Sequence, residues 1–272
     1  MRIRNHRLVD ADGETFNYHP TPNRGGTLSP RYIVMHFTAG SSAESSIAHF
    51  ADRNARASAH LVIGRDGSIT QMVPFNRVAW HAGVSAWQGL SGLNRHTIGI
   101  ELDNAGELDN RAAGWTSWFG RVYPEEDVVV AQHRNGGGES GWHRYTAEQL
   151  QSAFDASQAI FDHYNLEDIL GHDDIAPERK RDPGPAFNME SFSARLVGRV
   201  EDENPVFETI TRLNIREEDH HRATLLPEAP LAAGQRVALL SRSGVWCFVE
   251  VLGDDDLPYA TGWVHGRYIR RV

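Results

Sequence analysis

Cysteine is almost absent from this chain of 272 residues, because Cys247 is its single example. An intramolecular disulfide is therefore impossible, and a zinc site built from several cysteines is excluded. Long apolar runs are absent too: no stretch of about 18 apolar residues could span a membrane. The early arginines are not followed by the apolar run of about 7–15 residues that a secretory signal requires. We therefore expect a soluble chain that is made in the cytoplasm.

Positive charge is also scarce. The chain has 27 lysine and arginine residues against 36 aspartate and glutamate residues, a formal net charge of -9. No basic stripe is available to neutralise phosphates, so nucleic acid is excluded as the main partner. The apolar fraction of 40% is ordinary for a globular protein with a hydrophobic core, and the length allows one or two domains.

Short apolar runs alternate with amphipathic segments over most of the chain and predict an α/β domain, in which helices flank a mixed central β-sheet. The expected strands cover residues 31–37, 59–63, 69–73, 96–102 and 166–170. Helices are expected within residues 45–54 and from a capping box, Thr146 to Gln149, to about residue 163. Residues 1–30 are expected to form an extended arm or loops. We interpret residues 104–145 as a long loop inserted near a binding groove.

The pattern changes after an acidic linker at residues 201–204. Short alternating runs, separated by glycine, proline and aspartate, are typical of a small all-β barrel or sandwich. These runs cover residues 207–215, 236–240, 245–252 and 259–264. We therefore predict two domains, residues 1–204 and 205–272, the first with its core at about 30–190.

The segment from Gly171 to Pro185 (GHDDIAPERKRDPGP) concentrates groups that can do chemistry. Its three prolines are expected to exclude a helix and to stiffen it. His172 and Asp182 form half of a catalytic zinc site, which takes three protein ligands and leaves a fourth position open. The best candidate for the third ligand is His36, which ends another apolar run. Alternatively, these residues only fill the core or fix turns, since the chain has 14 histidines and no HExxH motif.

Two further side chains could act beside such a metal. Glu101 lies in an apolar strand, where a carboxylate is costly unless it is paired or working, and it could be a general base. Lys180 could stabilise an oxyanion. Alternatively, Glu101 is a strand-end carboxylate in water and Lys180 a solvated loop lysine. The segment Trp80 to Ser85 either packs on the core or forms a groove wall for sugars and peptide amides.

Several long motifs appear together and in order over residues 30–190. They are Tyr32 to Gly40 (YIVMHFTAG), Ser58 to Gly67 (SAHLVIGRDG), Val73 to Ser85 (VPFNRVAWHAGVS), Asn94 to Asp103 (NRHTIGIELD) and the segment from Gly171 to Pro185. With these motifs the chain resembles the zinc-dependent N-acetylmuramoyl-L-alanine amidases of the amidase-2 type, which are related to peptidoglycan recognition proteins. The resemblance implies an enzyme that cuts the amide between N-acetylmuramic acid and the L-alanine of a peptidoglycan stem peptide.

The resemblance also implies roles for individual residues. His36, His172 and Asp182 match the family's Zn²⁺ ligands, Glu101 its general base, and Lys180 the lysine that steadies the tetrahedral intermediate. In phage lysozyme-type relatives a tyrosine stands where this chain has Ala59, so we expect the glutamate branch of the mechanism. The residues expected to contact a peptidoglycan or muropeptide substrate are Trp80, His81, Ala82 and Asn94.

Residues 206–272 resemble a bacterial SH3-like module. The matching pieces are Leu213 to Arg216 (LNIR), Val245 to Val249 (VWCFV) and Gly262 to Ile269 (GWVHGRYI). The family's usual Ser-Gly-Pro is replaced by Glu217-Glu218-Asp219, which leaves a role in wall binding open.

Two alternative functions compete with the amidase hypothesis: a protein that binds peptidoglycan without cutting it, and a metallohydrolase of similar fold that cuts another amide. The setting also stays open, because a recycling enzyme, a phage endolysin and a toxin delivered to the periplasm or wall all fit. The sequence does not predict the oligomeric state.

Overall fold

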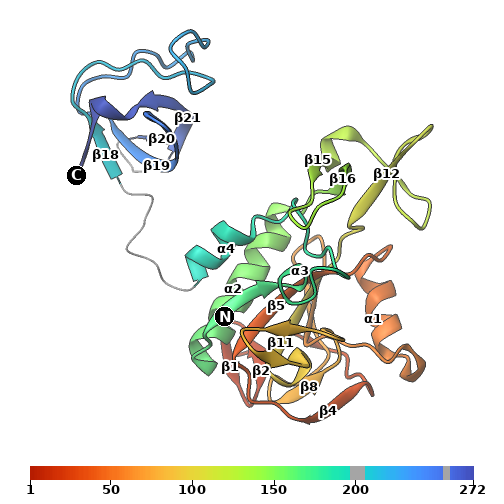
Figure 1. Ribbon diagram of the computed structural model, residues 1–272. Helices are drawn as coiled ribbons and strands as arrows, with labels where there is room; N and C mark the ends of the chain where they lie inside the picture. The colour runs from red at the N-terminus through yellow and green to blue at the C-terminus, as the bar shows by residue number, and fades with distance from the viewer. Residues whose placement is uncertain (197–205, 254–257) are drawn as a thin grey trace. The chain divides into compact units, whose positions relative to one another are not determined.

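The computed structural model describes residues 1–196, 206–253 and 258–272 (Figure 1). The chain forms two compact units, residues 1–198 and 199–272. The acidic linker predicted at residues 201–204, and with it the predicted boundary, lies outside the described residues.

The first unit is built on a mixed sheet of six strands. In spatial order they are β17 (Asp168–Gly171), β5 (Tyr32–Phe37), β11 (Thr97–Leu102), β6 (Leu61–Ile63), β7 (Ile69–Gln71) and β3 (Asn17–Tyr18). The first four run parallel, and β7 returns antiparallel to β6. The turn between β6 and β7 contains Gly67 at φ +79°, a left-handed conformation that glycine adopts without steric cost. The structure confirms the mixed sheet and its five predicted strands.

Helices cover this sheet, as predicted. They are α1 (Ala43–Ala51), α2 (Ala147–Tyr164), α3 (His172–Ile175) and α4 (Met189–Leu196). Short 3₁₀ turns lie at Arg53–Ala55, Leu93–Arg95, Glu125–Asp127 and Gly266–Tyr268. The apolar stripe of α2, including Ala153, Ala156 and Ile160, packs against Ile33 and Ile98 of the sheet in the main core.

Two sequence-based expectations about helices are wrong. The capping box at α2 is only half formed: Thr146 caps the helix, but the side chain of Gln149 donates to the backbone carbonyls of Ile63 and Asp103 instead. The segment at Gly171 was expected to exclude a helix. It contains the single turn α3, because that turn ends two residues before Pro177, the first proline.

The first 30 residues are more ordered than their polar composition indicates. The strands β1 (Arg2–Arg4) and β2 (Arg7–Val9) form a hairpin, and Ile3 and Leu8 join the main core. Further on, β4 (Arg24–Thr27) pairs with β8 (Arg77–Ala79), and β9 (Ala86–Trp87) pairs with β10 (Leu90–Ser91).

Residues 104–145 were expected to be a long loop, and this expectation is wrong. They form a separate antiparallel sheet (Figure 1), called the inserted sheet below. Its strands, in spatial order, are β14 (Val122–Tyr123), β13 (Gly114–Thr116), β12 (Glu107–Arg111), β16 (Glu139–His143) and β15 (Val128–Gln132). Its strands are only two to five residues long, so no long alternating run marks them in the sequence.

The second unit is all-β, as predicted. Its antiparallel sheet contains, in spatial order, β21 (Pro258–His265), β20 (Trp246–Leu252), β19 (Arg236–Ser243), β18 (Val206–Thr209) and β22 (Ile269–Arg271). Its core contains Ile215, Val237, Val249 and Val264. The SH3-like identity stays a prediction.

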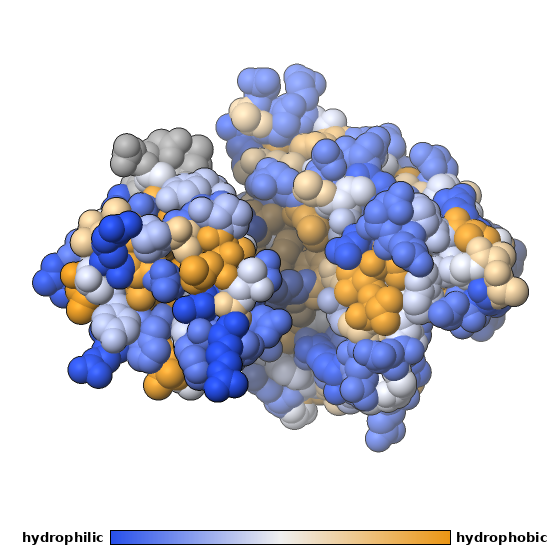
Figure 2. Space-filling view, turned by 90° about the horizontal axis from the view of Figure 1, so that it is seen from above, coloured by the Kyte–Doolittle hydropathy of each residue, from blue (hydrophilic) through white to orange (hydrophobic). Residues whose placement is uncertain are grey.

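On the face shown in Figure 2, hydrophilic residues predominate and hydrophobic residues lie in separate patches. Within the described parts of the chain, no helix has the length and apolar character needed to cross a membrane.

Candidate metal centre and its pocket

Three parallel strands bring the candidate site together at their carboxyl ends. His36 is the penultimate residue of β5, and His172 follows directly after β17. Glu101, on β11, stands in register with His36, so both side chains leave the same face of the sheet. That face is opposite to the one α2 covers. Carboxyl ends of parallel strands are a common place for ligand sites, and the loop after α3 adds Asp182.

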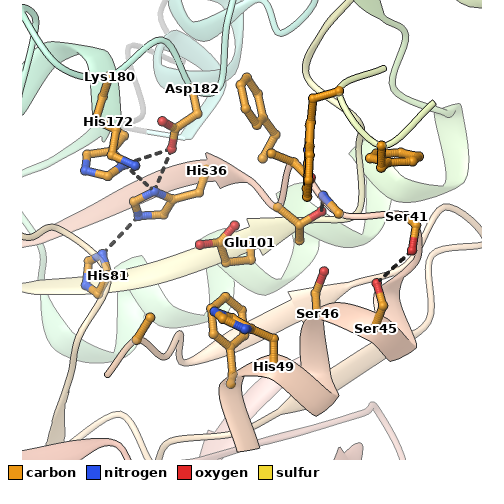
Figure 3. Close-up of a pocket in the computed structure, with 18 of the residues that line it drawn as sticks. His36, Ser41, Ser45, Ser46, His49, His81, Glu101, His172, Lys180 and Asp182 are labelled. Atoms are coloured by element: carbon orange, nitrogen blue, oxygen red, sulfur yellow. Dashed lines mark hydrogen bonds and ion pairs between the residues drawn. The ribbon is translucent and has the colours of Figure 1, made fainter. Parts of the chain in front are cut away.

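The three predicted ligands converge in the structure. The Nδ1 atoms of His36 and His172 lie 2.9 Å apart, and each lies 2.8 Å from Oδ2 of Asp182 (Figure 3). All three side chains are buried. The alternative that they fill the core separately or fix separate turns does not fit this convergence.

The donor set fits a metal cation. The outer nitrogens of both rings are engaged elsewhere: Nε2 of His172 lies 3.1 Å from the carbonyl oxygen of Ala82, and Nε2 of His36 lies 2.9 Å from Nδ1 of His81. A ring that donates from Nε2 presents a bare lone pair at Nδ1. Two imidazoles and one carboxylate that point at one another match a catalytic zinc site with an open fourth position.

The charge states suit metal binding as well. Burial, together with the neighbouring His172, lowers the pKa of His36 to about 4, so its ring is neutral at pH 7. Burial would raise the pKa of Asp182, but contacts with His172 and His36 outweigh it and hold this pKa below its usual value. The cluster therefore combines a neutral imidazole with an ionised carboxylate, which are the ligand forms that a metal requires.

Glu101 is buried rather than exposed to water. Its side chain is directed into the pocket beside His36 (Figure 3), and it is only 8% exposed. Its Oε2 atom has no hydrogen-bond partner among the described residues. Burial raises the pKa of Glu101 well above the ordinary value, and the carboxylate of Asp182 raises it further, whereas Lys180 lowers it. Such a carboxyl group is suited to proton transfer.

This buried carboxyl group makes a testable prediction about the metal-free protein. Because the folded-state pKa of Glu101 is raised, the native state holds its proton more tightly than the unfolded chain. Its contribution to stability is then lost as pH rises above about 4.5 and through the folded-state pKa. We expect Glu101→Gln to raise the Tm of the metal-free protein relative to wild type. Calorimetry should show that this difference in Tm between the variant and wild type increases as pH rises. A difference in Tm that decreases with pH would contradict a raised pKa at Glu101.

The three predicted ligands and Glu101 lie at one end of a cavity of about 550 Å³ (Figure 3). Trp80, His81 and Lys180 line it too, as predicted residues of the site. The inserted sheet contributes Trp118 and Phe119 to the lining, which sequence reasoning did not assign. The only sequence signal for them was a cluster of aromatic residues within the insertion. Trp118 is 71% exposed, and its indole N–H donates to the carbonyl of Ala39 at 2.7 Å.

Two predicted substrate contacts have structural partners instead of facing the cavity. Asn94 Oδ1 accepts from the backbone N–H groups of His81 and Ala82, at 3.0 and 2.7 Å. The carbonyl of Ala82 in turn accepts from Nε2 of His172. Asn94 therefore holds the backbone segment whose carbonyl contacts His172, one of the three predicted ligands.

The inserted sheet contacts the segment that carries His172 and Asp182. Arg134 donates to the carboxylate of Asp173, which follows His172 directly and is only 4% exposed. His133 Nε2 lies 3.1 Å from the carbonyl oxygen of Arg181, the residue before Asp182. His172 and Asp182, the two predicted ligands in this segment, thus each have a neighbouring residue that the inserted sheet contacts.

We expect Arg134→Ala to destabilise the first unit by about 1–3 kcal/mol, because the buried carboxylate of Asp173 then loses its charged donor. The matched control is Arg111→Ala, which removes an ion pair whose side chains are 51% and 66% exposed; its effect should stay within about 0.5 kcal/mol. Urea unfolding measures both. Equal effects of the two substitutions would show that the inserted sheet does not support the loop.

Comparison with known proteins identifies relatives of this chain. The family model Amidase_2, described as N-acetylmuramoyl-L-alanine amidase, matches residues 24–185. The chain is 37% identical over 139 residues to the 1,6-anhydro-N-acetylmuramyl-L-alanine amidase AmpD of Escherichia coli K12. The aligned region covers 50% of this chain and 57% of AmpD. It is 28% identical over 223 residues to the N-acetylmuramoyl-L-alanine amidase AmiD of the same organism. This aligned region covers 79% of this chain and 66% of AmiD.

Among solved structures, the crystal structure of a Se-Met AmpD derivative is similar to this chain at a TM-score of 0.48 and 28% identity, over 71% of this chain and 97% of that one. In sequence, the chain spans between about half and two thirds of the length of the two curated relatives named above.

Proposed function

Because the chain belongs to the N-acetylmuramoyl-L-alanine amidase family, we propose that it is a zinc-dependent peptidoglycan amidase. Its proposed substrate is the amide between the lactyl group of N-acetylmuramic acid and the L-alanine of the stem peptide. This proposal is supported by two relatives that are named N-acetylmuramyl- and N-acetylmuramoyl-L-alanine amidases. The single observation that carries this proposal is the convergence of two imidazoles and a carboxylate, beside the buried Glu101, at one end of the cavity.

In this proposal His36, His172 and Asp182 would hold the zinc ion, with the two converging Nδ1 atoms and a carboxylate oxygen as the candidate donors. A zinc ion held by three protein ligands supplies Lewis acidity, which lowers the pKa of water to about 7 and polarises a carbonyl group.

Glu101 and Lys180 provide the remaining chemistry. Glu101 accepts a proton from the attacking water as the new C–O bond forms at the lactyl carbonyl. The C–N bond then breaks, and Glu101 returns the proton to the amine of L-alanine; the products are a carboxylate and a free stem peptide. The positive charge of Lys180 stabilises the developing oxyanion.

The rest of the cavity is proposed to hold the substrate. Trp80, which follows β8, and Trp118, from the inserted sheet, both line the cavity and offer aromatic faces to a substrate. Such faces suit the apolar faces of sugar rings and peptide amides. The second unit, residues 205–272 in our division, is proposed to be SH3-like.

Mass spectrometry of soluble muropeptides and of purified wall after incubation with the protein tests this function. We expect stem peptides that begin with L-alanine, their loss with a chelator, and their return with added zinc. A protein that only binds peptidoglycan would sediment with the wall and release no peptide. Cleavage of a different amide would favour the second alternative, another metallohydrolase activity.

A further inference from the structure

The side chain of His81 contacts the outer ring nitrogen, Nε2, of His36, one of the three proposed metal ligands. We propose that His81 is a positioning residue that holds His36 in the tautomer required for metal binding, with the proton on Nε2 and a bare lone pair on Nδ1. This inference rests on the proposed zinc site and adds a residue outside the ligand set. The two rings meet edge to face, with centroids 5.1 Å apart and planes at 82°.

The direction of each hydrogen bond follows from a short chain of contacts. The hydroxyl of Thr97 donates its only proton to the carbonyl of Leu93 at 2.7 Å. It can therefore only accept from Nε2 of His81, which lies 3.2 Å away. With its proton on Nε2, neutral His81 presents a lone pair at Nδ1, 2.9 Å from Nε2 of His36. His36 must then donate from Nε2, which leaves its Nδ1 bare toward Asp182.

The backbone makes room for this ring. A Cβ atom at Gly99 would lie 2.4 Å from Cγ and 2.6 Å from Nδ1 of His81, far inside van der Waals contact. Gly99 stands in β11 between Thr97 and Glu101, on the same face of the sheet. A glycine weakens a strand interior, so its presence here fits a close approach of the His81 ring. Asn94 holds the backbone N–H of His81 from the other side.

The two ligand histidines are thus held differently. The Nε2 atom of His172 lies within hydrogen-bond distance of the backbone carbonyl of Ala82, and a carbonyl oxygen can only accept a hydrogen bond. The Nε2 atom of His36 meets a side chain that accepts only in one tautomer, which Thr97 selects. His60, another buried histidine, shows the contrast: its Nδ1 accepts from the N–H of Gly99 and its Nε2 meets the carbonyl of Arg77, so it orients no ligand.

Zinc affinity of substituted proteins tests the role of His81, by competition with a chelating dye. We expect His81→Phe, which fills the space but accepts no hydrogen bond, to bind zinc about 10–100-fold more weakly than wild type. His81→Gln keeps a carbonyl acceptor and should recover most of this loss. Thr97→Val removes the hydroxyl but keeps the backbone carbonyl of Thr97, which lies 3.4 Å from Nε2 of His81, so it should weaken binding less than His81→Phe does. Thr97→Ser, which keeps the hydroxyl, should bind like wild type. Wild-type affinity in His81→Phe would overturn the inference.

Nitrogen-15 NMR of the histidine rings in the wild-type zinc-loaded protein reports the tautomer of His81 directly. It therefore tests the inference even where a variant does not fold. We expect His81 as the Nε2–H tautomer, with a scalar coupling across the hydrogen bond between Nε2 of His36 and Nδ1 of His81. A proton on Nδ1 of His81 would overturn the inference while leaving the zinc site intact. Failure of the wild-type protein to bind zinc would instead refute the proposed function, and the same spectrum of the zinc-free protein would still report the tautomer.

Discussion

Glu101→Gln is expected to lower kcat for muropeptide hydrolysis by about 10²–10⁴-fold, which is the usual contribution of a positioned general acid–base group. The amide of glutamine matches the carboxyl group in shape but cannot take up the proton of the attacking water. Zinc content should stay at one ion per chain, because Glu101 is not among the three converging ligands.

The matched control for this substitution is Glu139→Gln, which makes the same chemical change at an exposed position of β16 in the inserted sheet. It should leave kcat and KM unchanged. Full activity of Glu101→Gln would remove Glu101 from the mechanism, and loss of zinc in this variant would show that the residue holds the metal instead.

His36→Ala is expected to abolish stoichiometric zinc binding and to lower kcat/KM by about 10³-fold or more. Several kcal/mol of metal-ion stabilisation are lost with the ion, and each 1.36 kcal/mol corresponds to a factor of ten. Elemental analysis after dialysis measures the zinc, and product formation from a muropeptide measures the rate.

His163→Ala serves as the control for this loss, because His163 is an exposed histidine in the last turn of α2. It should retain one zinc ion per chain and wild-type activity. One tightly bound zinc ion in His36→Ala would contradict the ligand assignment, even if activity were lost.

The main sheet and the convergence of His36, His172 and Asp182 could be predicted from the sequence because the underlying patterns are local. His36 and His172 each end a short apolar run, and parallel strands place such ends at one edge. Asp182 follows ten residues after His172 in a segment rich in proline, so its return to the same edge needed no long-range information. The resemblance to a known family supplied the chemical roles.

The parts that could not be predicted depend on contacts between distant residues. Gln149 has the sequence position of a capping residue, yet its amide is bound by Ile63 and Asp103, which are far apart in the chain. The role inferred for His81 needs Gly99 and Thr97 on a strand that comes beside it only in the fold. The inserted sheet is built from strands of two to five residues, too short for periodicity to separate from loops.

A raised pKa at Glu101 indicates a conflict between stability and function at this edge of the sheet. The buried carboxyl group destabilises the metal-free fold at neutral pH, as the Tm prediction above states. In the proposed mechanism the same carboxyl group transfers a proton once a cation and a substrate are bound. Natural proteins commonly accept such a cost in stability at catalytic positions.

Titration of the metal-free protein with zinc, while the release of stem peptide from a soluble anhydromuropeptide is followed, tests the central claim most directly. The proposed site predicts no release without metal, a rate that rises linearly with added zinc, and a break at one zinc ion per chain. Stem peptide released by the metal-free protein, or a rate that does not respond to zinc, would contradict it.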